Sequence, residues 1–516
     1  MNREQLSDAI GRLDDSIIEE AMTARRHRRP WWYAAVAVAA CVCLAVGMVA
    51  VWPQVKPDGA KPQADMDGAV TAVSTTTATK ETNRTTHTTK TTHVIDQRPS
   101  LVPLYAVAMA QYPQMVQRVD YDENEDEHYA WWESVRERRG QIQNHSDGMT
   151  DYYAKTMAQF LSGESGENRV YSPLNAYLAL AMLAETAEGD SRAQILDLLG
   201  VSDLTALREK CSALWNGVYL NDGAVTSVLA NSLWLSDGDR WQYDMDTVKA
   251  LAEHYYASTF EGAMGSADYN RALQDWINEQ TDNLLKEQAG GLEFDPNTVL
   301  ALASTINYRA KWVNDFDPDD NEEGVFHTAN GEVPCTYMTQ EGMEMAYLGK
   351  NFTAVSLGLD DGAYQMYFFL PDEGVAVDRL ITDRQVLQVM QEGTSSPLAE
   401  YVLVDMTIPK FDVTSDQDLV SGLKNLGVTD VFDSQKGDFG GILTEQDEPV
   451  WVEQARHAAR VSVDEEGVTA AAYTVMMLCG TGAPQKTLEF TVDRPFMFAV
   501  TGPGETILFT GVVENP

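Results

Sequence analysis

An uncharged apolar run near the N-terminus is the feature that most constrains how this chain can fold. The run, WWYAAVAVAACVCLAVGMVAVW, covers residues 31–52 and has Trp at both ends. As a helix these 22 residues would be about 33 Å long, roughly the thickness of the hydrocarbon core of a bilayer. We therefore expect residues 30–52 to form a transmembrane anchor, with the rest of the chain divided between the two sides of a membrane.

The charges that flank the run indicate its orientation. Residues 25–29 read RRHRR, whereas only Lys56 and Lys61 follow the run closely. The positive-inside rule then makes residues 1–29 a cytoplasmic tail and places the bulk of the chain outside the cell, as a single-pass plasma membrane protein. The alternative is a cleaved signal peptide, but the run is longer than a usual h-region and no A-x-A site follows it.

Two segments of unusual composition follow the anchor. Residues 53–100 are rich in Pro and Thr, and 12 of the 22 residues from 71 to 92 are Thr, so this segment should be a solvated linker, either bare or O-glycosylated. Residues 101–146 combine an apolar beginning with the acidic run DYDENEDEH. We treat them as an N-terminal extension, and the sequence predicts no role for it.

The remainder, residues 147–516, has the pattern of one large folded domain. Helical spacing is present in residues 151–161 and 173–187, and strand patterns dominate roughly the last 110 residues. An α+β fold with large antiparallel sheets is expected. The formal net charge of −41 repels nucleic acid, which excludes that class of partner.

Motifs that would indicate catalysis or a bound group are missing from the sequence. There is no G-x-S-x-G elbow, no H-E-x-x-H pair and no Rossmann glycine cluster, and the five cysteines give no disulfide or zinc pattern. The segment GTGAPQKT (480–487) lacks the second glycine of a phosphate loop and precedes a strand pattern. We therefore predict no catalytic residue, no metal site and no cofactor.

A second uncharged segment lies near the C-terminus. In VDEEGVTAAAYTVMMLCGTGAPQK (463–486), acids and Gly467 precede residues 468–485, which carry no charge. Strand side chains alternate between faces, and one alternating set is small or apolar throughout, so the segment could enter a sheet without burying a charge. This set consists of Val468, Ala470, Ala472, Thr474, Met476 and Leu478.

Within this segment, VSVDEEGVTAAAYT (461–474) resembles the reactive-loop hinge of the serpins, the serine protease inhibitor family. Further stretches in the same order resemble serpin motifs: NRVYSPLNAYLALAML (168–183), INYRAKWVNDFDPDDNEEGVFH (306–327), YFFLPDEG (367–374), VTDVFD (428–433) and the C-terminal DRPFMFAV with TILFTGVVENP. The resemblance covers residues 147–516. With the anchor, the chain is identified as a membrane-anchored, bacterial-type member.

The resemblance implies a fold of three β-sheets and about nine helices with an exposed reactive-centre loop. It also implies suicide inhibition. A protease cuts the loop and forms an acyl ester with it, the loop then enters the largest sheet as a new strand, and the trapped protease is distorted. The expected partners are extracellular serine proteases, and the inhibitor is expected to be a monomer. The alternative is a noninhibitory serpin that acts as a surface binding or structural protein.

The resemblance also assigns residues to parts of this machinery. The hinge would consist of Glu465, Glu466, Gly467, Val468, Thr469, Ala470, Ala471 and Ala472. A buried hydrogen-bond cluster that governs opening of the sheet would contain Ser172, Asn175, Asn307 and His457, with Trp312 under the point where the loop begins to insert. Asn175 replaces a Ser that is usual in the family.

The spacing from hinge to cleavage site that is usual in serpins, counted from Glu465, places the reactive bond at Thr481–Gly482. The usual spacing counted back from Pro495 places the bond at Pro484 instead, so its position stays open within residues 478–484. No Arg or Lys occurs from 461 to 485, and small residues surround the bond, which favours elastase-like or subtilisin-like targets. Cys479 has an alternative reading as a reactive thiol.

Overall fold

The computed structural model describes residues 100–516, apart from 120, 122–123, 146–147, 164–165, 224, 239, 361–362 and 469–485. The predicted tail and anchor, and the linker up to residue 99, lie outside this part of the chain. So do the hinge residues Thr469–Ala472 and the bond Thr481–Gly482. Within the described residues, no helix has both the length and the apolar character needed to cross a membrane.

Eleven α-helices lie in the described residues, and two of them, α10 and α11, are only four residues long. The helices are α3 (Glu125–Gly140), α4 (Thr150–Phe160), α5 (Pro173–Thr186), α6 (Gly189–Leu199), α7 (Leu204–Val218), α8 (Met245–His254), α9 (Ala267–Gln280), α10 (Lys286–Ala289), α11 (Asp378–Ile381), α12 (Arg384–Glu392) and α13 (Val420–Asn425). Short 3-10 helices are η1 (Val102–Leu104), η2 (Gln141–Asn144), η3 (Pro318–Asp320), η4 (Gly393–Ser395), η5 (Asp430–Phe432) and η6 (Pro503–Glu505).

The strands dominate the second half of the chain, which includes roughly the last 110 residues, where the sequence predicts them. They are β1 (Ala106–Ala108), β2 (Arg169–Tyr171), β3 (Leu220–Asn221), β4 (Thr226–Ser236), β5 (Ala257–Gly262), β6 (Leu300–Lys311), β7 (Glu322–Thr328), β8 (Gly331–Leu348), β9 (Phe352–Leu359), β10 (Tyr364–Pro371), β11 (Ala399–Pro409), β12 (Phe411–Asp418), β13 (Arg456–Asp464), β14 (Gly467–Val468), β15 (Thr487–Thr491), β16 (Phe496–Gly502) and β17 (Thr506–Val513).

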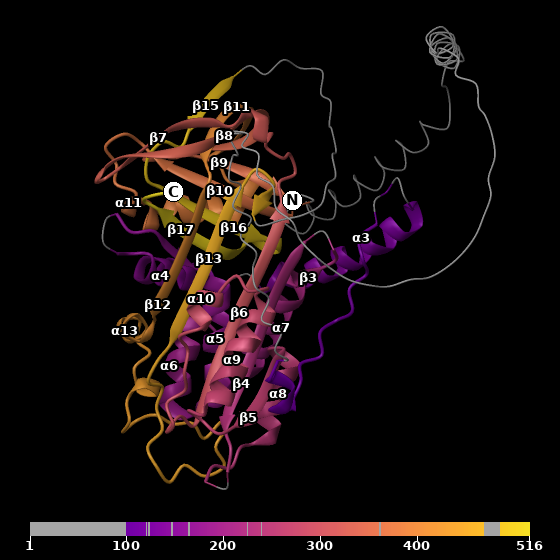
Figure 1. The fold of residues 1–516 in the computed structure, drawn as a ribbon, viewed down its shortest axis with the longest axis vertical. Coiled ribbons are helices and arrows are strands. Elements are labelled where there is room, and N and C mark those ends of the chain that lie inside the picture. The colour runs from indigo at the N-terminus through magenta and orange to yellow at the C-terminus, as the bar shows by residue number, and fades with distance from the viewer. Residues whose placement is uncertain are drawn as a thin grey trace, which may run out of the picture. The chain divides into compact units, whose positions relative to one another are not determined.

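The first sheet has the order β1-β5-β4-β6-β14-β13-β12, with β3 beside β4, and its long strands run along the molecule (Figure 1). β6 pairs with β4 along most of its length, but on its other side it pairs only with the two residues of β14. β13 likewise pairs with β12 along its length and with β14 at one end. Among the described residues, β6 and β13 are not paired with each other.

The second sheet has the order β15-β11-β8-β9-β10-β16-β17-β2, with β7 beside β8. The family resemblance implies three sheets, whereas the described strands form two hydrogen-bonded networks. The reason is β8, whose 18 residues pair with β7 and β11 and then, from Met345 to Leu348, with β9. One long strand therefore joins two sheets into one.

Helix α5 occupies the centre of the core. Ser172 caps its N-terminus and Pro173 takes the first helical position, where a missing N–H costs nothing. Almost every residue of PLNAYLALAMLAET is buried, as expected of a helix that is apolar on all sides. α5 packs against β6 and β17, and thus connects both sheets. This element and α4 confirm the two helices predicted from residue spacing.

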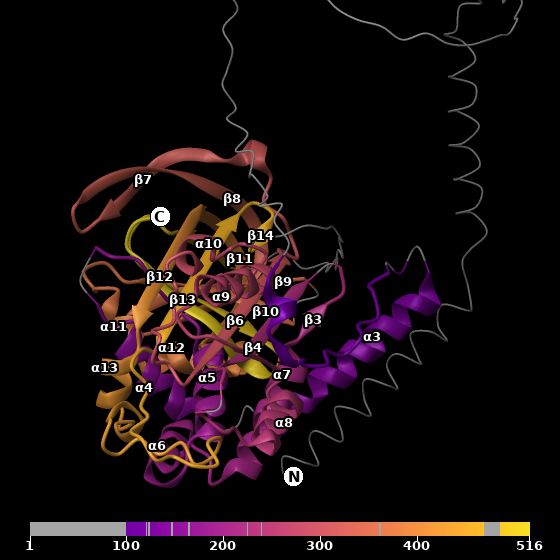
Figure 2. The ribbon, with the colours of Figure 1, turned by 60° about the horizontal axis from the view of Figure 1, so that its bottom comes forward.

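The N-terminal extension packs into the same compact unit as the rest of the described chain. β1 adds to the edge of the first sheet by antiparallel pairing with β5. Figure 2 shows α3 beside α7, and Trp131 and Val135 of α3 are buried in the main hydrophobic core. Nε1 of Trp131 donates to a carboxylate oxygen of Asp222 at 2.8 Å. The described part of the extension is therefore structural.

Candidate functional site: the loop hinge and the sheet-opening cluster

The hinge begins inside the first sheet. After β13 the chain turns at Glu465 and Glu466 and returns as β14, antiparallel to both β13 and β6. Val468 lies between Val463 and Ala310 and is only 3% exposed. Its side chain therefore belongs to the buried face of the sheet, the face on which the serpin resemblance would place it.

Gly467 is required by a close approach of two backbones. Its φ of +146° lies in a region that side-chain-bearing residues rarely adopt. A Cβ built there would meet the carbonyl oxygen of Ala310 at 2.3 Å and Cα of Lys311 at 2.7 Å. Glycine at this position thus allows β14 to lie against β6.

The acidic residues before Gly467 hold the turn in place. Oδ1 of Asp464 accepts hydrogen bonds from the backbone N–H groups of Glu466 at 3.0 Å and of Gly467 at 3.3 Å. Glu465 forms an ion pair with Lys410 at 2.8 Å and accepts a hydrogen bond from the side-chain amide of Asn321. Burial alone would raise the pKa of Glu465, but these two partners outweigh it and the pKa falls below its ordinary value.

Trp312 lies directly under this turn. Its indole Nε1 donates to the carbonyl oxygen of Asp464 at 2.9 Å, and its backbone N–H donates to the carbonyl oxygen of Glu466 at 3.2 Å. The ring is 4% exposed and meets Phe316 edge to face at 6.0 Å. The structure thus places Trp312 against the turn that precedes β14.

Three of the four predicted members of the sheet-opening cluster come together around the start of α5. Oγ of Ser172 accepts the backbone N–H of Asn175 at 3.3 Å and donates to the carbonyl oxygen of Leu508 on β17 at 2.6 Å. The backbone N–H of Ser172 donates to Nε2 of His457 on β13 at 3.1 Å. His457 is 5% exposed, and burial lowers its pKa to about 4, so the ring is neutral with its proton on Nδ1.

The fourth predicted member, Asn307, does not join the cluster, and Ser304 provides the contact with β6 instead. Nδ2 of Asn175 donates to the carbonyl oxygen of Ser304 at 3.3 Å, and Oγ of Ser304 donates to Oδ1 of Asn231 on β4 at 2.7 Å. Oδ1 of Asn307 is buried without a hydrogen bond in the described part of the chain. The two residues are three apart on one strand, so their side chains point to opposite faces.

The register of β6 with β14 identifies the face on which Ser304 lies. Ser304 is an even number of residues from Ala310, which pairs with Val468, so both side chains lie on the face that the loop would share. Sequence reasoning that matched residue type to a motif selected the asparagine on the other face.

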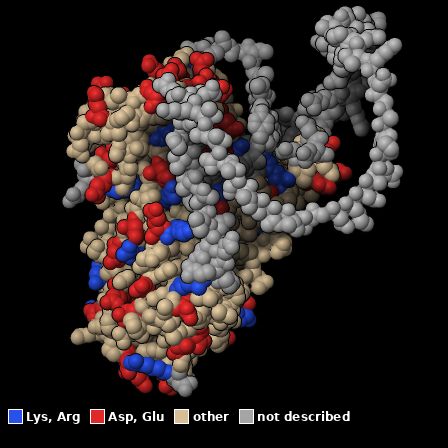
Figure 3. Space-filling view, in the orientation of Figure 1, with Lys and Arg blue, Asp and Glu red and all other residues tan. Residues whose placement is uncertain are grey.

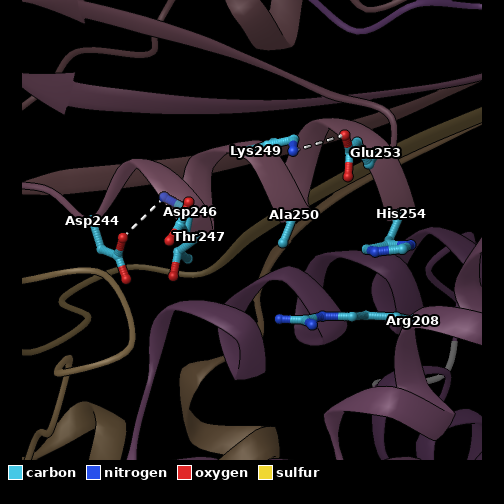
Figure 4. Close-up of a pocket in the computed structure, with 8 residues that line it drawn as sticks. All are labelled: Arg208, Asp244, Asp246, Thr247, Lys249, Ala250, Glu253 and His254. Atoms are coloured by element: carbon cyan, nitrogen blue, oxygen red, sulfur yellow. Dashed lines mark hydrogen bonds and ion pairs between the residues drawn. The ribbon is translucent and has the colours of Figure 1, made fainter.

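A separate cavity of about 370 Å³ lies between α7 and α8 (Figure 4). Both signs of charge line it, with Lys249 and Glu253 paired at 3.7 Å and Arg208 paired with Glu185. Oδ1 of Asp244 accepts the backbone N–H of Asp246 and caps α8. No predicted site residue lines this cavity.

Residues 148–516 match the family model described as "Serpin (serine protease inhibitor)". The chain belongs to the serpin family. This serpin is therefore grouped with inhibitors of serine proteases and not with enzymes.

Known serpins resemble the chain at moderate identity. Putative serpin-Z12 of Oryza sativa subsp. japonica is 26% identical over 379 residues, which are 69% of this chain and 86% of that protein. Plasminogen activator inhibitor 1 of Mus musculus is 25% identical over 391 residues, 71% of this chain and 91% of that protein. The crystal structure of tengpin, a thermophilic serpin, in its native state superposes with a TM-score of 0.65 at 22% identity, covering 81% of this chain and 99% of tengpin.

Proposed function

We propose that this serpin is a suicide inhibitor of extracellular serine proteases, of elastase-like or subtilisin-like specificity, that traps its target by inserting the cut loop into the first sheet. The observation that carries this proposal is the position of β14. It lies between β6 and β13 and is antiparallel to both, so the loop that follows Val468 starts from within the sheet.

The length of β6 fits the length of the loop. If the pairing of Val468 with Ala310 continued one residue at a time, Leu478 would lie opposite Leu300, the first residue of β6. The inserted strand would then extend about 33 Å beyond Val468. A cut after Thr481 leaves a short spacer beyond that point, so a protease held by an ester at Thr481 would be carried to the far end of β6.

The side chains that would face one another in this register support insertion of the loop. Thr474, the polar member of the alternating set that begins at Val468, would lie beside Ser304 of β6 and His457 of β13, which are polar residues at the sheet-opening cluster. Elsewhere the inward residues would meet apolar side chains, so no charge is buried. The pairs with β6 are Ala470 with Tyr308, Ala472 with Ile306, Met476 with Leu302 and Leu478 with Leu300.

The basic residue nearest the loop supports the choice of target class. Nζ of Lys486 pairs with Oε2 of Glu400 at 2.6 Å, and β15 begins at the next residue, where it pairs with β11. A trypsin-like protease would have to unpair this strand in order to bind the Lys486–Thr487 bond in its cleft. Proteases that accept small residues would find the reactive bond at Thr481–Gly482 in the uncharged segment.

We also propose that this protein is a membrane-anchored serpin of bacterial type. The apolar run of residues 31–52 and the arginines before it support an anchor with a cytoplasmic N-terminus and the serpin domain outside. Protease added to intact cells should then release the domain. A domain that stays protected until the cells are lysed would contradict this orientation.

Inhibition itself is tested by mixing residues 53–516 with a panel of serine proteases and running a denaturing gel. An ester-linked complex survives boiling in detergent, and the proposal predicts such a complex with elastase-like or subtilisin-like enzymes. Cleavage of the loop without any complex across the panel would contradict inhibition and leave the noninhibitory alternative.

A further inference from the structure

The outer face of the sheet formed by β8, β11 and β15 is unpartnered in the described structure and adjoins the end of the reactive loop. Val402, Val404 and Met406 of β11 point into the core and are at most 5% exposed. The residues between them therefore point outward. Tyr401 is 63% exposed, and Met343 of β8, which pairs with Leu403, is 38% exposed.

Three carboxylates lie side by side on this outer face. Asp405 of β11 pairs with Glu341 of β8 on one side and with Glu489 of β15 on the other, and all three residues are exposed. Like charges directly opposite one another destabilise a sheet. Among the described residues, no Lys or Arg forms an ion pair with any of the three. Figure 3 shows Asp and Glu side chains gathered at the end of the molecule where β11 and β15 lie.

The outer face of β8, β11 and β15 is continuous with the reactive loop, which a protease would bind. β15 begins at Thr487, directly after the loop, and Thr487 itself pairs with Leu403. Glu489 lies seven residues beyond Gly482, so at most about 25 Å of extended chain separates the proposed bond from the row of carboxylates. A protease of ordinary size bound at Thr481–Gly482 must stand over this edge of the sheet.

We propose that this outer face docks the target protease and selects enzymes whose active-site rim carries Lys or Arg. The inference rests on the proposed inhibitory function and adds to it the charge of the partner. Cations on the protease would neutralise Glu341, Asp405 and Glu489, and Tyr401 with Met343 would cover apolar surface beside them. Charge complementarity at a rim acts mainly on the association rate.

The test compares the parent with the triple variant Glu341→Gln, Asp405→Asn, Glu489→Gln. The matched control is Asp197→Asn, Glu209→Gln, Glu279→Gln, which removes the same charge from exposed positions on α6, α7 and α9. The readout is the total rate of loop attack, complex plus cleaved inhibitor, by a cationic and by an anionic elastase-like protease, at low and at high salt.

The docking triple should slow attack by the cationic protease about tenfold at low salt, and far less at high salt. The control triple should change the rate with either protease by less than about twofold, and the docking triple should leave attack by the anionic protease unslowed or faster, because like-charge repulsion is removed. Equal rates for parent and docking triple, or equal slowing by the control, would overturn the proposal. The fraction of attacked inhibitor that ends as a covalent complex reports separately on inhibition. If the charge effect on the attack rate is present but no complex forms, the proposed inhibitory function is contradicted and the docking proposal is not.

Discussion

The backbone N–H of Ser172 donates to Nε2 of His457 at 3.1 Å, and this hydrogen bond joins the start of α5 to β13. Both residues are buried, and the imidazole can accept the bond only while Nε2 is unprotonated. The joint between the central helix and the sheet is therefore sensitive to protonation.

Acid should weaken this joint. Burial lowers the pKa of His457 from 6.5 to about 4, so the unfolded chain takes up a proton at higher pH than the folded chain. The stabilisation is complete above about pH 6.5 and is lost as the pH falls toward 4, a difference on the order of 3 kcal/mol. Denaturant unfolding of the parent and of His457→Gln across this window measures it. The free energy of unfolding should fall more steeply in the parent, and parallel profiles would contradict the assignment.

Replacing Gly467 by Ala should push β14 out from between β6 and β13. The new Cβ would collide with the carbonyl oxygen of Ala310, and the backbone angle is unfavourable for alanine, so we expect a loss of about 1–3 kcal/mol. Gly140→Ala is the matched control because nothing lies within 4 Å of its Cβ position and its φ is ordinary. Thermal unfolding compares the two. Equal stability of both variants would mean that β14 does not lie against β6.

A charge at Val468 should block trapping, whereas the same charge at Thr469 should not. Val468 is buried between two strands, and an unpaired carboxylate there costs several kcal/mol. Thr469 is the next residue, and if the pairing of Val468 with Ala310 continued on insertion it would be opposite Arg309, with its side chain on the outer face by alternation. Val468→Glu and Thr469→Glu are each mixed with an elastase-like protease, and complex and cleaved inhibitor are quantified. Equal trapping by the two variants would show that the assignment of faces is wrong.

The extension contributes to stability through Trp131 and not through its neighbour. Trp131 is 2% exposed and hydrogen-bonded to Asp222, whereas Trp132 is 43% exposed. Trp131→Ala should therefore cost about 3–5 kcal/mol, and Trp132→Ala less than about 1 kcal/mol. Denaturant titration of both variants distinguishes them. A small effect of Trp131→Ala would show that the extension is not part of the domain core.

The sequence predicted the features that depend on residues close together in the chain. The apolar stretch of residues 173–187 is sufficient to predict the helix α5, whereas alternation groups Val468 with every second residue after it without showing which face is buried. It did not predict contacts that depend on partners distant in the chain. Glu465 is held by Lys410 and Asn321, and Trp131 of the extension is hydrogen-bonded to Asp222, and neither set of partners follows from a periodicity.

The sheet-opening cluster shows the same limit within one strand. Residue type favoured Asn307, because an amide can both donate and accept, while the pairing of Val468 with Ala310 selects the face that contains Ser304. Only the register between two strands distinguishes these neighbours, and register is a tertiary property.

The central claim is that the loop enters the sheet between β6 and β13 after it is cut. Backbone hydrogen exchange of the intact and the loop-cleaved serpin measures this directly, because a strand paired on both sides protects its amides. The account predicts that amides from residue 469 to 478, up to the register position opposite Leu300, become strongly protected after cleavage near Thr481. Fast exchange throughout this segment in the cleaved protein would contradict insertion.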